Sequence, residues 1–169
     1  GFVAKLDANG DYEWATQGGG TDSDNGKGVS VLADGSSIVL GQFAGTATFG
    51  STTLTSAGGS DVFVAKLDAN GDYEWATQAG GTSTDSGRRV SVLADGSSIV
   101  TGSFQGTATF GNTPPLTSIG GDDGFVAKLD ANGDYEWATQ GGGTDSDNGK
   151  GVSVLADGSS IVLGQFAGT

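Results

Sequence analysis

The string FVAKLDANGDYEWATQ occupies residues 63–78, and identical copies stand at residues 2–17 and 125–140. In its first half Phe63, Ala65 and Leu67 alternate with Val64, Lys66 and Asp68. This period of two predicts a β-strand with one face more buried than the other. Asn70-Gly71 then supplies a tight turn, because both residues readily take positive φ angles. Residues 73–78 return as a second strand, so the string predicts a β-hairpin with Trp75 packed in its core.

A second hairpin is predicted before this one in the chain. Two strand signals, residues 29–33 and 37–43, flank Asp34-Gly35, another dipeptide suited to a type I′ turn. Residues 44–62, rich in Gly, Ser and Thr, join the two hairpins and are expected to form a long connection, with residues 46–49 extending the strand before them. Each unit therefore carries four strands, named a to d here in chain order.

The unit recurs with a period of 61 and then 62 residues, which is the signature of a repeat architecture. Repeat 1 covers residues 1–61 and repeat 2 covers residues 62–123, with the extra residue assigned to the Asn-Thr-Pro-Pro stretch at 112–115. Partial repeat 3, residues 124–169, copies residues 1–46 without a change. Such identity indicates a recent duplication or a designed sequence.

The fold class predicted from these units is all-β. The chain has 33 glycines, and no window is long or periodic enough for an amphipathic helix. Four antiparallel strands in about 60 residues, repeated without helices, are typical of a β-propeller blade. The alternative is a parallel β-helix, which has a shorter repeat period and whose G-G-x-G-x-D calcium motif is never complete in this chain.

The strand order predicts that the chain starts and ends in mid-blade. It reads c-d, then a-b-c-d twice, then a-b, so each end carries the half that the other lacks. A closed propeller usually needs about four to eight blades, more than the three that one chain supplies. We therefore expect a homo-oligomer built by head-to-tail completion of the half-blades, or a longer repeat array of which this is a segment.

The strings FVAKLDANG, YEWATQ and GGGTDSDNGKGVSVLADGSSIVLGQF, together residues 2–43 apart from Asp11, resemble the SBBP β-propeller repeat of bacterial secreted and surface proteins. The resemblance covers nearly the whole chain, once per repeat, and departs from the usual pattern in the insertions at residues 44–62 and 105–124. It implies a propeller fold and a secreted or cell-surface location in a bacterium, with the targeting signal outside this segment. It implies no common chemistry.

Composition narrows the classes of function. The formal net charge of −13 would repel a nucleic acid or an anionic membrane surface, and no apolar run is long enough to span a bilayer. The chain has no His and no Cys, which removes the usual general base, thiol nucleophile and zinc ligands. Every acidic residue that might catalyse recurs in each repeat, whereas a catalytic centre needs a unique constellation. We therefore predict a non-enzymatic module for scaffolding and protein interaction.

The loops between strands d and a and between strands b and c lie at the same end of an antiparallel blade, so residues 20–27 and 57–61 are expected to converge on one face as candidate calcium sites. Oxygen ligands of the kind that calcium prefers, with glycines beside them, are offered by Asp22, Asp24, Asn25, Asp61, Asp145, Asp147 and Asn148. The competing interpretation is that these are solvated turn residues. Repeat 2 weakens the metal interpretation because Arg88 and Arg89 follow Asp85, so sites at 21–25 and 144–148 are expected rather than one at 82–86. Calcium is thus the only cofactor that the sequence suggests.

Aromatic pairs suggest a second function. Each repeat places a Tyr two residues before a Trp, and in a lectin-like propeller such side chains would stack on sugars at one shallow site per blade. The candidate glycan-binding residues are Tyr12, Trp14, Tyr73 and Trp75. Core packing is the competing interpretation of the same residues.

Overall fold

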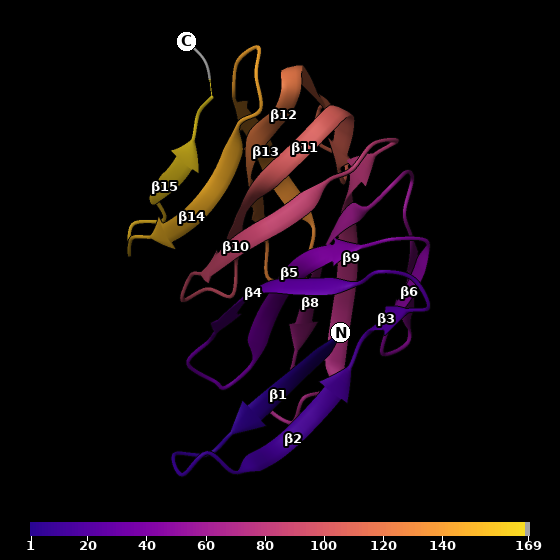
Figure 1. Cartoon of the computed structure of the whole chain (residues 1–169). Helices are drawn as coiled ribbons and strands as arrows, with labels where there is room; N and C mark the ends of the chain where they lie inside the picture. Colours follow the sequence, from indigo (N-terminus) through magenta and orange to yellow (C-terminus); the bar gives the residue numbers. More distant parts are fainter. Residues whose placement is uncertain (168–169) are drawn as a thin grey trace.

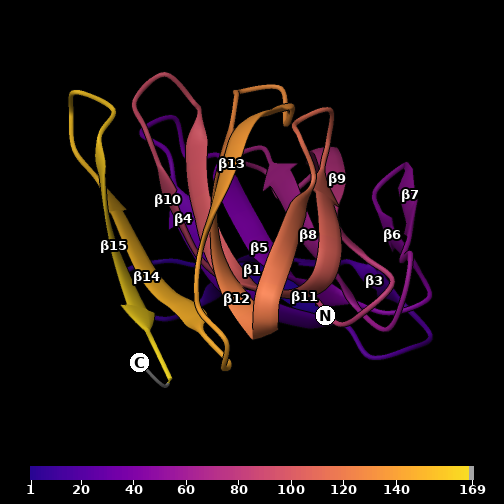
Figure 2. The same cartoon turned by 90° about the horizontal axis from the view of Figure 1, so that it is seen from above.

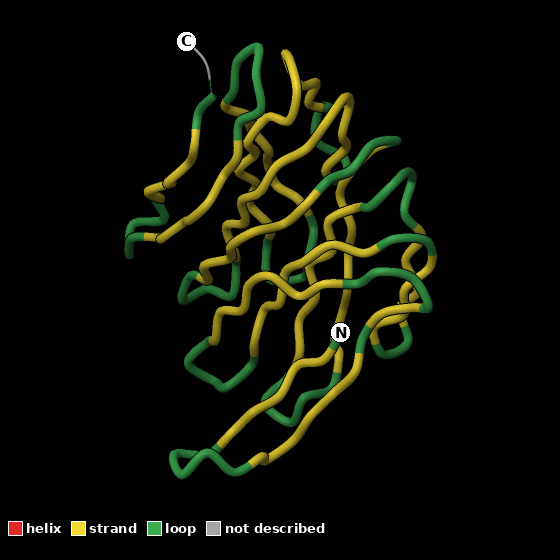
Figure 3. The backbone as a smooth tube through the Cα atoms, in the orientation of Figure 1, coloured by secondary structure: helices red, strands yellow, loops and turns green. Residues whose placement is uncertain are grey.

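The computed structural model describes residues 1–167, and these residues form strands and turns with no helix (Figure 3). The all-β prediction is therefore confirmed. Because it holds no helix at all, this part of the chain also holds none that could cross a membrane.

Eight strands form two antiparallel meanders of four. Meander 1 consists of β4 (Asn25–Val31), β5 (Ser37–Phe43), β8 (Asp61–Leu67) and β9 (Tyr73–Gly81). Meander 2 consists of β10 (Ser86–Val92), β11 (Ser98–Phe110), β12 (Leu116–Leu129) and β13 (Tyr135–Gly141). A hairpin precedes them, β1 (Phe2–Leu6) with β2 (Tyr12–Gln17), and a hairpin follows them, β14 (Asn148–Val154) with β15 (Ser160–Gln165). The order of strands is the one predicted from the repeat.

Tight turns form at both dipeptides, but they are not the predicted type I′ turns, because only the glycine of each dipeptide takes a positive φ angle. Gly71 takes a φ of 88° and Gly35 one of 86°, values that disfavour a side chain. Ahead of Gly71, one oxygen of the Asp68 carboxylate accepts hydrogen bonds from the backbone amides of Asn70 and Asp72 at 2.8 and 2.9 Å. The DANGD sequence thus encodes a capped hairpin turn, as expected, and its first aspartate is a structural acceptor.

The connection between the hairpins is more ordered than predicted. In repeat 1 it contains a small hairpin, β6 (Thr46–Phe49) with β7 (Thr52–Thr55), and β6 pairs with β3 (Gly19–Gly20) at the end of the preceding unit. In repeat 2 the same residues continue β11, whose end pairs with the end of β9. The two meanders are thereby joined at this point into one eight-stranded sheet, which curls into a half-barrel.

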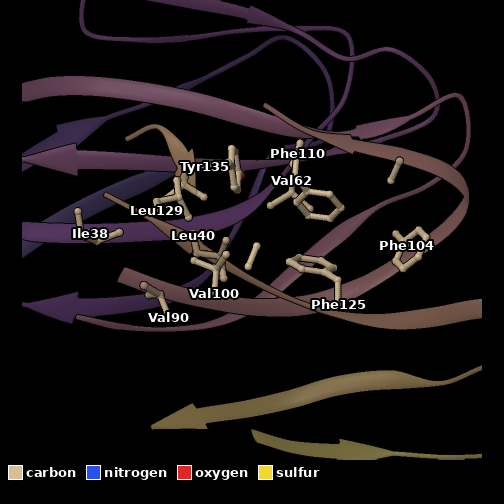
Figure 4. Close-up of a cluster of buried hydrophobic side chains, with 14 residues drawn as sticks. Ile38, Leu40, Val62, Val90, Val100, Phe104, Phe110, Phe125, Leu129 and Tyr135 are labelled. Atoms are coloured by element: carbon tan, nitrogen blue, oxygen red, sulfur yellow. The ribbon is translucent and has the colours of Figure 1, made fainter. Parts of the chain in front are cut away.

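The meanders also pack against one another through their faces. The larger core cluster takes Ile38, Leu40 and Val62 from meander 1 and Val100 and Phe125, among others, from meander 2 (Figure 4). A second cluster lies on the other face of meander 1 and contacts Val3 of the first hairpin. β5 and β8 are consequently buried on both faces. The prediction of one more exposed face is wrong for this repeat, since Val64 is as buried as its neighbours.

The two terminal hairpins lie at opposite ends of this stack. Figure 1 places β1–β2 at the lower end and β14–β15 at the upper end, and Figure 2 shows β14–β15 beside β10 on the far side of the molecule from β6–β7. Contacts agree with the pictures: β14 lies against β10, β11 and β12, and β10 lies against β4 and β5. The half-units therefore cannot pair with each other within one chain.

Candidate functional site: the joints between repeats

In the first two repeats, the ring of the tryptophan packs on the DANGD turn of the next repeat. The indole Nε1–H of Trp14 donates to the carbonyl oxygen of Ala69 at 3.0 Å, and that of Trp75 donates to the carbonyl oxygen of Ala131 at 3.2 Å. The ring covers the turn glycine, so a Cβ built on Gly71 would stand only 2.6 Å from the Trp14 ring, and one on Gly133 only 2.7 Å from the Trp75 ring. The glycine is required because the ring fills the space above it.

This packing decides where the candidate glycan-binding residues lie. Trp14 and Trp75 are half-buried between repeats, and their polar edges are already bonded. Tyr73 is half-buried and meets the ring of Phe49 edge to face at a centroid distance of 5.7 Å. Tyr12 is exposed, although its equivalent in repeat 3, Tyr135, is buried in the core. The four residues therefore form no common platform for a sugar.

Two buried carboxylates converge at the joint between meanders 1 and 2. Asp61, at the start of β8, and Asp85, just before β10, are each 1% exposed. A Cβ built on Gly80 would lie 3.0 Å from Oδ1 of Asp61 and 2.8 Å from Oδ2 of Asp85, so both side chains point to the same spot above that glycine. The loops that carry them run side by side, and the Asp85 amide donates to the carbonyl oxygen of Ser60 at 2.7 Å.

The hydrogen bonds of this pair are unequal. Both oxygens of Asp85 accept backbone amides, Oδ2 from Gly81 at 2.7 Å and Oδ1 from Gln105 at 3.2 Å. Asp61 accepts only the Ala57 amide at 3.1 Å on Oδ2, and its buried Oδ1 has no partner among the described residues. Burial raises the pKa of Asp85 to about 6, with the Asp61 charge adding to the effect, and burial also raises the pKa of Asp61.

Counterparts of both residues are buried at the next joint, where the Asp147 amide donates to the carbonyl oxygen of Asp122 at 2.6 Å. Asp123, at 0% exposure, approaches Gly142, and Asp147, at 1%, accepts the Gly143 amide at 2.6 Å on Oδ2. Oδ1 of Asp123 is buried without a partner, as in Asp61. Pairing the end of one unit with the start of the next is thus a regular property of the stack.

The structure distributes the predicted calcium ligands differently from the expectation. Asp24 accepts the Gly20 amide at 2.6 Å and lies beside Gly19, while Asp22 and Asn25 are exposed and Asp61 lies at the following joint. In repeat 3, Asp147 is buried, Asn148 is half-buried and Asp145 is exposed. The carboxylates that converge are those of Asp61 and Asp85, with Asp123 and Asp147 as their counterparts, so the sequence prediction missed Asp85 and Asp123. Within residues 1–167 no three acidic side chains come together, so a calcium ion at a pair would take its other ligands from backbone carbonyls or water.

One larger cavity opens beside the first hairpin. It has a volume of about 480 Å³ and is lined by Phe2, Val3, Val29, Val39, Phe63 and Tyr73, among others. It lies between β1 and β4. The corresponding space between β8 and β10 is occupied by β5, which pairs with β8 and contacts β10.

Comparison with known proteins gives one informative likeness. No family model matches the chain. It is 35% identical over 137 residues to the regulatory protein FlaEY of Caulobacter vibrioides. The match covers 78% of this chain but 14% of that protein, so the chain spans a small part of the relative's length.

Proposed function

We propose that this chain is a run of β-propeller blades that serves as a non-enzymatic interaction and scaffolding module, secreted from a bacterium or displayed on its surface. The observation that carries the proposal is the stacking of four-stranded meanders through both faces, with β5 and β8 buried on each side. Blades of a propeller meet their neighbours in this way, and strand a of each blade lies beside strand a of the next. The contact of β4 with β10 and of β10 with β14 follows that pattern.

The non-enzymatic part of the proposal is supported by what the recurring polar residues do. Asp68 caps a turn, Asp34 accepts both the amide and the hydroxyl of Ser36, and Asp85 accepts two amides. These contacts recur in the other repeats with the same residue types. These side chains are engaged in structural hydrogen bonds in every copy. The exposed parts of the loops at the joints, whose sequence differs between repeats, are therefore the surface that remains for a partner.

An interaction role predicts that partners bind at the ends of the strands where the joints between repeats lie. A photo-crosslinking amino acid placed at exposed Asp22 in the full-length protein should therefore capture partner proteins in the encoding bacterium. The same probe at exposed Asn70, in a turn at the opposite end of the strands, is the matched control. Equal labelling at the two positions, or none at Asp22, would contradict this role.

The proposed location has its own test. FlaEY is named a regulatory protein, and an interaction module is compatible with such a name. Protease added to intact cells of the encoding bacterium should cleave the segment while a cytoplasmic marker stays whole. Protection of the segment until the cells are lysed would refute the surface or secreted location and leave the interaction role standing.

The lectin-like alternative keeps one feature in its favour. Trp137 of repeat 3 is 39% exposed, so it is the tryptophan best placed to stack on a sugar. A glycan array probed with the chain and with Trp137→Ala separates the two functions. Binding that disappears in the variant would support the lectin function, and an array without signal would leave the scaffolding proposal in place.

A further inference from the structure

The joint between meanders 1 and 2 buries two acidic side chains without a basic partner. Asp61 and Asp85 are each 1% exposed, and they belong to consecutive repeats. The three ion pairs among residues 1–167 each join a lysine to a glutamate, so none of them involves either aspartate. A buried charge is costly unless it is paired, so this pair of carboxylates needs a proton or a cation between its members.

The backbone amides around the pair supply only part of this compensation. Asp85 accepts two amides on its two oxygens, whereas Asp61 accepts one amide on Oδ2. Oδ1 of Asp61 is buried and accepts no hydrogen bond from the described residues. The same atom of Asp123, the counterpart of Asp61 at the next joint, is also buried without a partner there. An oxygen left free at the same position in two successive repeats points to a ligand that the protein itself does not supply.

The free oxygen of Asp61 faces Asp85 across a space that a glycine leaves open. A Cβ built on Gly80 would lie 3.0 Å from Oδ1 of Asp61 and 2.8 Å from Oδ2 of Asp85. Any residue other than glycine would place its Cβ at this point between the two carboxylates. The separation from each oxygen is close to the distance of about 2.3–2.6 Å at which oxygen ligands bind calcium.

We propose that the Asp61–Asp85 pair binds one calcium ion, which links the loop before β8 to the loop before β10. Oδ1 of Asp61 and Oδ2 of Asp85 are its two charged ligands, and backbone carbonyls and water are its neutral ligands. Oδ2 of Asp85 can bind the ion while it accepts the Gly81 amide, because a carboxylate oxygen has two lone pairs. The inference depends on neither the partner nor the location proposed for the module.

Calcium suits this joint better than the other common metal ions. The softer metals prefer Cys and His ligands, and the chain has neither residue. Magnesium requires near-ideal octahedral geometry, whereas calcium accepts an irregular set of carboxylates, carbonyls and water. Two carboxylates are few charged ligands for calcium. We therefore expect a dissociation constant of about 0.1–1 mM, as in calcium-binding modules outside cells.

The ion would strengthen a contact between repeats that the backbone already makes. The Asp85 amide donates to the carbonyl oxygen of Ser60 at 2.7 Å, and the Gly59 amide donates to that of Ser83 at 2.9 Å. The two carboxylates come together only when the repeats are docked in this way. Calcium therefore binds the folded stack and not the unfolded chain, so it stabilises the stack by mass action.

Thermal melts of this chain at about pH 7.5 test the proposal. With the expected affinity, about 10 mM calcium should raise the melting temperature of the wild type by about 3–10 °C relative to chelator. Asp61→Asn keeps the shape of the side chain but removes its charge, so its melting temperature should not respond to calcium. In chelator this variant should melt no lower than the wild type, because it lacks the repulsion between two buried carboxylates.

Asp72→Asn is the matched control. It also removes one negative charge, but Asp72 is exposed in the turn at the opposite end of β8. Its response to calcium should equal that of the wild type. The comparison separates binding at the joint from a general effect of calcium on a chain with a net charge of −13.

Calorimetric titration with calcium measures the binding directly. It should give one ion per wild-type chain and a dissociation constant at least about tenfold weaker in Asp61→Asn. Asp85→Asn removes the second charged ligand and should lose the calcium response as well, so the test does not depend on a single variant. Wild-type melts that are identical in calcium and chelator, or equal calcium responses in Asp61→Asn and Asp72→Asn, would overturn the inference.

Discussion

The glycine under each tryptophan ring gives a quantitative test of the stacking between repeats. Gly133→Ala and Gly10→Ala change the same residue of the same DANGD turn, and both glycines have a φ of 90°. An alanine in this left-handed region costs about 1–2 kcal/mol at either position. Only at Gly133 does the new methyl group also meet a ring, since Cε3 of Trp75 lies 2.7 Å from the built Cβ.

The magnitude follows from these two terms. Forcing a methyl group into a filled space costs about 1–3 kcal/mol, so Gly133→Ala should lower the free energy of unfolding by about 2–5 kcal/mol and Gly10→Ala by about 1–2 kcal/mol. Urea unfolding measures both losses.

A double-mutant cycle identifies the ring as the cause. With Trp75→Ala in place, Gly133→Ala should cost only the backbone strain of about 1–2 kcal/mol, because the atoms it met are gone. Two results would refute the ring contact as the reason for a glycine at this position: equal losses of unfolding free energy for Gly133→Ala and Gly10→Ala, or an undiminished loss for Gly133→Ala in the Trp75→Ala background.

Two further outcomes concern the buried carboxylates. The folded pKa of Asp85, about 6, is above its unfolded value of 3.8, so its contribution to stability is complete below about pH 4 and is lost as the pH rises through 6. Urea unfolding should therefore detect a fall of about 3 kcal/mol that Asp85→Asn flattens, and parallel pH curves for the two proteins would contradict it. If calcium binds the Asp61–Asp85 pair, millimolar calcium should raise the melting temperature of wild type above pH 6 and not that of Asp85→Asn, whereas identical melts in calcium and chelator would count against the site.

The sequence predicts the local structure of this chain well because its turns have a specific chemistry. Asp34-Gly35 and Asn70-Gly71 need positive φ angles at glycine, and the strands beside them alternate, so both hairpins and their order could be read directly. Residues 46–55 were predicted only in part. Their alternating Thr-Ala-Thr-Phe pattern and Gly50, with a φ of 61°, were the available signal for a hairpin, but threonines on both sides gave it little apolar contrast.

The sequence predicts that loops between strands b and c converge with loops between strands d and a, as they do, but it does not predict which copies of these loops meet. Asp22, Asp24 and Asn25 stand together in the chain, but the stack brings together residues from consecutive repeats. Asp61 meets Asp85 only because the loop before β8 lies beside the loop before β10. Such a contact depends on how one unit packs on the next, and neither hairpin pattern nor composition encodes that offset.

Identical sequences in this chain have different environments, which separates what a repeat encodes from what its neighbours supply. Trp14 and Trp137 belong to copies without a single difference, yet one is bonded to the next repeat and the other is exposed. The turn, the strand and the ring are encoded in each repeat, whereas burial requires an adjacent copy. The stability of a repeat therefore depends on contact with an adjacent repeat as well as on its own sequence.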